Sequence, residues 1–200
     1  MEAKVKRGPG RPSEGAREAL VEAAHGLFME RDYEEVSIEE ILRRSGVSRG
    51  ALYHHFPSKL DLFRAVYEAS ETRVMERLAV NLEGVSSPFE ALVVGARAYL
   101  RQCETDEELR RIGLTQSRAV LGWEGWRAAA TELGIGLVLG LVRAAMDAGE
   151  MPPRDPETTA HILLAALIEA AMLVVAADDR GAARKRSEAV IAELLEGLRR

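Results

Sequence analysis

The sequence has few cysteines and no long uninterrupted apolar run, and both scarcities limit what the protein can be. Its one cysteine, Cys103, has no partner in the chain, so no internal disulfide can form and we expect a cytoplasmic protein. The longest apolar stretch, residues 162–177, is interrupted by Glu169 and is too short to span a bilayer comfortably. Residues 1–15 lack the apolar core of a secretory signal. We therefore expect neither a membrane segment nor a leader.

An excess of positive charge is also missing, which at first argues against a nucleic-acid partner. The net charge is −5, but the first 64 residues hold 11 basic and 11 acidic side chains. The remaining 16 basic and 21 acidic residues therefore carry the whole net charge. Within the first segment the basic residues gather at 4–17 and 43–59, so a small basic face can coexist with an acidic total.

Residues 1–12 form a basic arm with almost nothing apolar. Lys4, Lys6, Arg7 and Arg11 stand among glycines and prolines, a composition typical of a flexible tail. Its "KRGPGRP" resembles the AT-hook core, in which an arginine lies in a narrow minor groove. The alternative is a solvated tail with only general attraction to phosphate, and the sequence leaves both open.

The rest of the chain predicts an all-α fold of about nine helices with no convincing strand. Alanine, leucine, glutamate and arginine dominate, while β-branched residues are scattered. Capping boxes begin predicted helices at Ser37 and Ser58, and Ser87 followed by Pro88 begins another. Further starts are expected at Thr105 and Asp155.

Two short predicted helices, 37–45 and 48–55, are joined by a turn at Gly46. They are too short to be stable alone, so apolar side chains must hold them on neighbouring elements: Ile38, Ile41, Leu42, Val47, Leu52 and Phe56. Two such helices on a three-residue turn with glycine match the helix-turn-helix (HTH) geometry. The second helix is then expected to enter the major groove of DNA.

The outward side of the second short helix carries the chemistry for reading DNA. Arg49 near its start could bind guanine O6 and N7 with both arms of its guanidinium. Gly50 and Ala51 would allow close approach, while Tyr53 and His55 have polar tips suited to phosphate oxygens. Lys59, at the start of the next helix, adds a cation.

The adjacent histidines His54 and His55 do not predict a metal site. Neighbouring residues on a helix point about 100° apart, so the two cannot share one ion as an i, i+4 pair does. No cysteine or acidic residue at ligand spacing joins them. We expect no metal and no cofactor. The remaining alternative is a histidine packed against the protein's own core.

The segment "SIEEILRRSGVSRGALYHHFPSKLDLF" resembles the DNA-binding domain of the TetR family of bacterial regulators, over about residues 14–64. After the arm at 1–12, the resemblance implies an HTH domain (13–73, with the HTH at 37–56) and a helical ligand-binding and dimerisation domain (74–200). It also implies a homodimer on a palindromic operator. By matching position it implies phosphate contacts from Ser37, Ser48, Tyr53, His55 and Lys59, and base-facing positions at Arg49, Gly50, Ala51 and His54. Arg44 completes the candidate DNA-binding set. Leu42 and Ser45 stand where the family usually has alanine.

The last two predicted helices carry more apolar surface than one chain can easily cover. "HILLAALIEAAMLVVAA" is apolar all round apart from Glu169, and "SEAVIAELLEGLRR" carries an apolar stripe. A four-helix interface with a second copy would bury both. The alternative is that both helices close the core of a single chain.

A ligand pocket needs apolar walls and a few polar groups, and six residues are candidates: Tyr99, Cys103, Trp123, Trp126, Glu169 and Met172. Glu169 stands out because a buried carboxylate must be paired, protonated or face a polar cavity. It could meet a cationic ligand or one of Arg97, Arg101 and Arg118.

We therefore expect a small-molecule-responsive regulator, a repressor released from its double-stranded DNA operator by an inducer of unknown identity. The helix beginning at Ser58 joins both domains and is the expected lever. A regulator without a ligand is one alternative. An enzyme in the C-terminal half is another, but no nucleophile with a base, phosphate loop or metal cluster is visible in the sequence.

Overall fold

The computed structural model describes residues 14–199, and these fall into two compact units that divide between Ala69 and Ser70. The described residues form eight α-helices, one 3-10 turn and one π-helix, with no strand among them. The all-α prediction is thus confirmed for this part of the chain. The basic arm at 1–12 lies outside the described residues.

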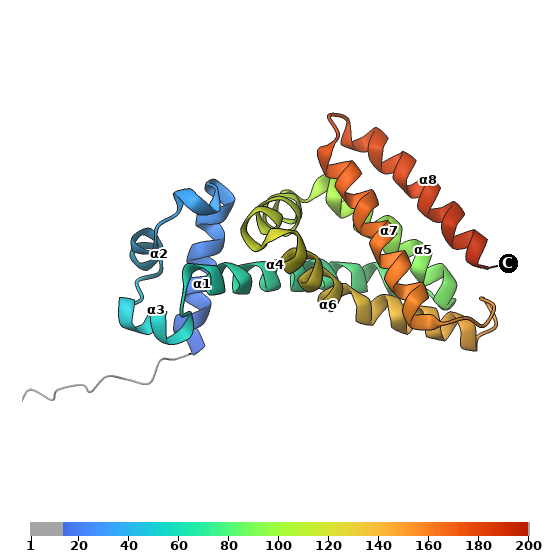
Figure 1. Ribbon diagram of the computed structural model, residues 1–200, viewed down its shortest axis with the longest axis horizontal. Helices are drawn as coiled ribbons and strands as arrows, with labels where there is room; N and C mark the ends of the chain where they lie inside the picture. Colours follow the sequence, from blue (N-terminus) through green and yellow to red (C-terminus); the bar gives the residue numbers. More distant parts are fainter. Residues whose placement is uncertain (1–13, 200) are drawn as a thin grey trace, which may run out of the picture. The chain divides into compact units, whose positions relative to one another are not determined.

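The first unit holds three helices and the beginning of a fourth (Figure 1). Its elements are α1 (Glu14–Glu30), the 3-10 turn η1 (Tyr33–Glu35), α2 (Ile38–Ser45), α3 (Arg49–His55) and the first half of α4 (Lys59–Leu82). Phe28 and Phe63 pack edge to face at 5.2 Å between ring centroids, and Tyr33 lies within 6 Å of both. This aromatic cluster ties α1 to α4, and the short helices α2 and α3 both pack against α1.

The second unit is a bundle built from the rest of α4 and four further helices (Figure 1). Its elements are α5 (Pro88–Thr105), the π-helix η2 (Leu109–Gln116), α6 (Ser117–Asp147), α7 (Pro156–Ala176) and α8 (Arg180–Leu198). Helices α5 to α8 pack on one another, and α7 and α8 lie side by side. Gly122, with φ of 70°, breaks the regular helix within α6.

Most of the expected helix starts in this unit are present, with one difference. The Ser87 hydroxyl accepts from the Glu90 N–H at 3.0 Å, and the Asp155 carboxylate accepts from the Thr158 N–H at 2.6 Å. No helix starts at Thr105, because its hydroxyl donates back to the Arg101 carbonyl as part of α5. Asp106 follows as the cap, accepting from the Leu109 N–H at 3.1 Å.

The N-terminus of α5 is capped in part by an acidic side chain from much further along the chain. The Glu150 carboxylate, just after α6, accepts from the Phe89 N–H at 2.8 Å and from the Ser87 hydroxyl at 2.9 Å. These two bonds satisfy free donors at the helix N-terminus, and the negative charge suits the positive end of the helix dipole. Glu150 thereby fixes the end of α6 to the beginning of α5.

The outer surface of α7 and α8 is apolar. Ile162 and Leu173 of α7 are 63% and 59% exposed, and Val190 and Leu194 of α8 are 56% and 50% exposed. By contrast, Ile191 and Leu195 are buried against the bundle. Two stretches, Leu109–Asp147 and Pro156–Ala176, are long and apolar enough to cross a membrane, but core helices of soluble proteins also pass this test. Both stretches belong to the bundle.

Candidate functional site

Helix α3 is positioned by caps and turns that lie within the HTH segment itself. The Ser37 hydroxyl accepts from the Glu40 N–H at 3.3 Å to begin α2, and Ser48 accepts from the Ala51 N–H at 3.3 Å to begin α3. Gly46 ends α2 with φ of 68°, a left-handed conformation that disfavours other residues. Leu52 is fully buried and sets which side of α3 faces inward.

The remaining side of α3 faces solvent as the sequence predicts. Arg49, Gly50, Tyr53 and His54 are exposed, and Ala51 is half-buried. A Cβ placed on Gly50 would meet no atom within 4 Å, so internal packing does not require glycine there. This face combines a cation, a phenol and an imidazole around a position with no side chain.

Arg49 forms an ion pair with Glu39 of α2, and both side chains are more than half exposed. A hydrogen bond to its own backbone N–H and then the Arg49 guanidinium lower the pKa of Glu39. Exposed pairs of this kind contribute little to stability, because solvent screens the attraction. The guanidinium can therefore leave Glu39 at little cost when a stronger acceptor is offered.

Two other predicted DNA-binding cations are held by the first unit itself. The Arg44 guanidinium donates to Glu30 at 2.7 Å. The Lys59 ammonium donates to the Tyr33 carbonyl and lies 4.0 Å from the centre of the Tyr33 ring, and burial lowers its pKa. Arg44, like Arg49, therefore takes part in an exposed ion pair, whereas the Lys59 ammonium is partly buried against Tyr33.

The two histidines contact each other without forming a metal site. The rings of His54 and His55 meet edge to face at 5.5 Å, and His55 also lies 6.3 Å from the Phe56 ring. His55 is half-buried, with its Nε2 lacking a hydrogen-bond partner among the described residues. No group of three metal-binding side chains occurs within residues 14–199.

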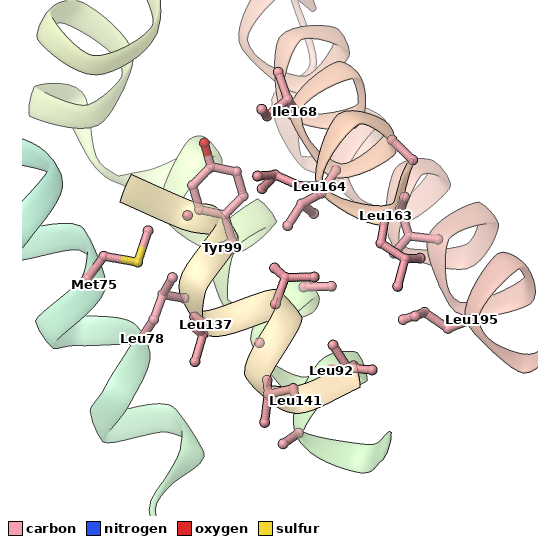
Figure 2. Close-up of a pocket in the computed structure, with 18 of the residues that line it drawn as sticks. Met75, Leu78, Leu92, Tyr99, Leu137, Leu141, Leu163, Leu164, Ile168 and Leu195 are labelled. Atoms are coloured by element: carbon pink, nitrogen blue, oxygen red, sulfur yellow. The ribbon is translucent and has the colours of Figure 1, made fainter. Parts of the chain in front are cut away.

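The second unit contains an apolar cavity enclosed by all five of its α-helices. It holds about 950 Å³ of empty space, counting its opening to solvent. Figure 2 shows labelled side chains converging on it from α4 (Met75, Leu78), α5 (Leu92, Tyr99), α6 (Leu137, Leu141), α7 (Leu163, Leu164, Ile168) and α8 (Leu195). Its predominantly apolar walls are of the kind that small-molecule pockets have.

Of the six residues predicted for a pocket, the structure places only Tyr99 in the wall of this cavity. Cys103 is fully buried elsewhere on α5, and burial raises the pKa of its thiol to about 12. Met172 contacts Arg118, with 3.6 Å between the sulfur and a guanidinium nitrogen. Glu169 is exposed, on the apolar outer surface of α7 and α8. The expected buried carboxylate on α7 is therefore not found.

Neither tryptophan lies in the wall of this cavity. Trp126 is buried and its indole N–H donates to the Gly113 carbonyl at 3.0 Å, while the Ser117 hydroxyl donates to the same oxygen at 2.5 Å. Trp123, which directly follows the break at Gly122, is 53% exposed. The Arg118 guanidinium lies over both indole rings, at 5.3 and 5.4 Å.

A carboxyl group does line the cavity, but from a helix that the sequence prediction overlooked. Glu71 of α4 is only 6% exposed, and its burial raises its pKa to about 7. The available signal was its spacing, since Glu71 precedes the apolar residues Met75, Leu78 and Leu82 by four, seven and eleven positions. That spacing places all four on one side of the helix.

Known proteins resemble both units. Residues 20–66 match the family described as "Bacterial regulatory proteins, tetR family". Residues 89–198, more than half of the chain, match "Tetracyclin repressor-like, C-terminal domain".

Individual relatives agree with this assignment. The HTH-type transcriptional repressor BepR of Brucella suis is 30% identical over 158 residues, which cover 74% of this chain and 75% of that protein. The A-factor receptor protein of Streptomyces griseus is 32% identical over 74% of this chain, but the match spans only half of that protein's length. The crystal structure of a TetR-family regulator from Pectobacterium atrosepticum superposes with a TM-score of 0.79 at 30% identity, covering 92% of this chain and 94% of that chain. The chain belongs to the TetR family of bacterial DNA-binding transcriptional regulators.

Proposed function

We propose that the protein is a ligand-responsive repressor that binds a palindromic operator as a homodimer and is released by a small molecule. The observation that carries the proposal is α3, a seven-residue helix whose buried Leu52 turns Arg49, Gly50, Tyr53 and His54 outward. A helix presented in this way can place its N-terminal residues against base edges in the major groove.

We assign recognition of the operator base sequence to Arg49. A guanidinium that binds guanine O6 and N7 discriminates against a wrong base by about 1–3 kcal/mol. This exceeds the small contribution of its exposed ion pair with Glu39, so the exchange of partners favours DNA. Ser37, Ser48, Tyr53, His55 and Lys59 are proposed to position the protein on phosphates. Gly50, Ala51 and His54 lie near the bases, with Arg44 at the margin.

We assign dimerisation to the apolar outer surface of α7 and α8. Ile162, Leu173, Val190 and Leu194 are all at least half exposed, an arrangement that a second copy would bury by forming a four-helix interface. A two-fold dimer matches a palindromic operator because each half-site then meets one α3.

We assign the effector site to the cavity around Tyr99. One relative, from Streptomyces griseus, is an A-factor receptor protein, and this supports an effector-binding role for the second unit. An effector changes DNA affinity only through its unequal binding to two states of the protein, typically by about 1–3 kcal/mol. Helix α4 runs from the first unit into the second and is the proposed lever.

Selection of binding sites from random duplex DNA, with purified protein, tests this function. We expect an inverted repeat, a complex containing two protein chains, and a base preference that relaxes at one position per half-site in Arg49→Ala. Enrichment of no sequence, or a single chain on each duplex, would contradict the proposal. A regulator without an effector is the second candidate, and operator binding unaffected by a broad compound screen would favour it.

A further inference from the structure

We propose that the effector is a lipophilic amine, whose ammonium group pairs with the Glu71 carboxylate while its apolar body fills the cavity. This inference rests on the proposed function, because it names the chemical class bound at the proposed effector site. Its basis is the placement of a single acidic side chain, without a partner, in an otherwise apolar wall.

Glu71 lies in the wall of the cavity and is unpaired. Its side chain belongs to the same stripe of α4 as Met75 and Leu78, which also line the cavity. Within residues 14–199, no hydrogen bond or ion pair engages its carboxyl group. An ionised carboxylate buried in this way is strongly disfavoured unless a cation or hydrogen-bond donor reaches it.

The neighbouring arginines are already engaged and do not fill this role. Arg77 donates to Asp106 at 2.5 Å and to Gln102 at 3.2 Å, and Arg73 is paired with Glu108. Since these guanidinium groups have partners of their own, Glu71 keeps its capacity to bind a cation. Glu71 is therefore placed to bind a ligand, since neither arginine forms an ion pair with it.

The surrounding backbone leaves room for this carboxyl group. A Cβ on Gly113 of η2 would lie 2.8 Å from Glu71 Oε1, so any larger residue there would displace the side chain. The Gly113 carbonyl is fixed by Trp126 and Ser117, which holds this part of η2 in place. Gly113 belongs to the π-helix η2, and π-helical geometry is often found at functional sites.

The charges of the cavity wall select the ligand class. No lysine, arginine or histidine occurs among the described residues that line it, and Tyr99 supplies the only other polar side chain apart from the thioether of Met75. A carboxylate or phosphate ligand would meet a like charge without a counter-ion. An ammonium group would gain the Glu71 carboxylate, and the face of Tyr99 offers a further attraction for a cation. The leucine-rich remainder of the wall requires an apolar body.

Three compounds that share the same apolar group test the proposal. Their binding to the full-length protein is measured by calorimetric titration at pH 7.5. They are 4-butylbenzylamine, 4-butylbenzyl alcohol and 4-butylphenylacetate, which differ in charge and hardly in shape. We expect the amine to bind at least about tenfold more tightly than the alcohol, since hydrogen bonds to charged groups are the stronger ones. The carboxylate should bind most weakly. Equal binding of amine and alcohol, or no binding of any probe, would overturn the proposal.

Glu71→Gln identifies the group responsible, and Glu76→Gln is the matched control on an exposed position of the same helix. We expect Glu71→Gln to remove the preference for the amine while leaving affinity for the alcohol within about twofold, and Glu76→Gln to change neither. A preference that survives in Glu71→Gln would overturn the role of Glu71. Operator binding is measured separately: release of DNA by the alcohol as well as the amine refutes the amine class but keeps the effector site.

Discussion

Replacing Glu71 by glutamine should change how the stability of the protein depends on pH. In the folded chain, burial raises the pKa of Glu71 from its ordinary 4.5 to about 7, with Arg77 opposing the shift and Glu108 adding to it. The unfolded chain releases that proton near pH 4.5, so it binds fewer protons than the folded chain between these values. Folded-state stability is therefore lost as pH rises from 4.5 through 7. Glutamine is neutral throughout and removes this loss.

The size of the effect follows from the two pKa values. A rise from 4.5 to about 7 corresponds to roughly 3 kcal/mol once both states are fully ionised. Between pH 5 and pH 8, linkage makes the wild-type protein lose about 2–3 kcal/mol relative to Glu71→Gln. The variant should therefore be close to wild type at pH 5 and clearly more stable at pH 8.

Urea unfolding followed by tryptophan fluorescence measures this difference, because both tryptophans of the chain lie in α6 and report on the second unit. Protein concentration must be equal at each pH, since association also contributes to apparent stability. Glu76→Gln serves as the control and should track wild type. A stability difference between Glu71→Gln and wild type that stays constant from pH 5 to pH 8 would refute the account of Glu71 as a buried, unpaired carboxyl group.

Four further outcomes are expected. Arg49→Ala should weaken binding to the selected operator by about 1–3 kcal/mol, measured by fluorescence anisotropy; an equal loss on unrelated duplexes would contradict base reading. Lys59→Ala should weaken binding to all duplexes alike and reduce the salt-dependence slope by about one; an unchanged slope would show that the ammonium serves only Tyr33. Gly46→Ala should destabilise the first unit by about 1–2 kcal/mol, because alanine disfavours a φ of 68°; an unaltered urea midpoint by circular dichroism would argue against that strain. Leu173→Glu should convert a dimer to monomers in light scattering, and a dimer that persists would place the interface elsewhere.

The DNA-facing segment could be predicted well because its signals lie close together in the sequence. The capping hydroxyls of Ser37 and Ser48, the left-handed turn at Gly46 and the inward Leu52 all act within a few residues of the feature they determine. What the sequence could not reveal was which cations have internal partners. Lys59 meets Tyr33, 26 positions away, and Arg44 meets Glu30 on another helix.

The cavity was harder to predict because five helices contribute to it. Glu169 stands in the most apolar stretch of the chain, so burial was the natural expectation, but the side of α7 that carries it faces outward. Glu71 stands in a polar-looking stretch, "EASETR", and only the position of α4 within its unit turns it inward. For these two glutamates, the composition of the surrounding stretch was a poorer guide to burial than the spacing of the residue from the apolar residues of its own helix.

The bond between Glu150 and the start of α5 has a consequence for how the second unit assembles. The Phe89 N–H and the Ser87 hydroxyl gain this acceptor only when residue 150, 61 and 63 positions further along, is in place, so the start of α5 and the end of α6 stabilise each other. A fragment that stops before Glu150 should leave α5 frayed at Phe89, and proteases should cut it there first. The Glu150 carboxylate thereby couples the folding of α5 to that of α6.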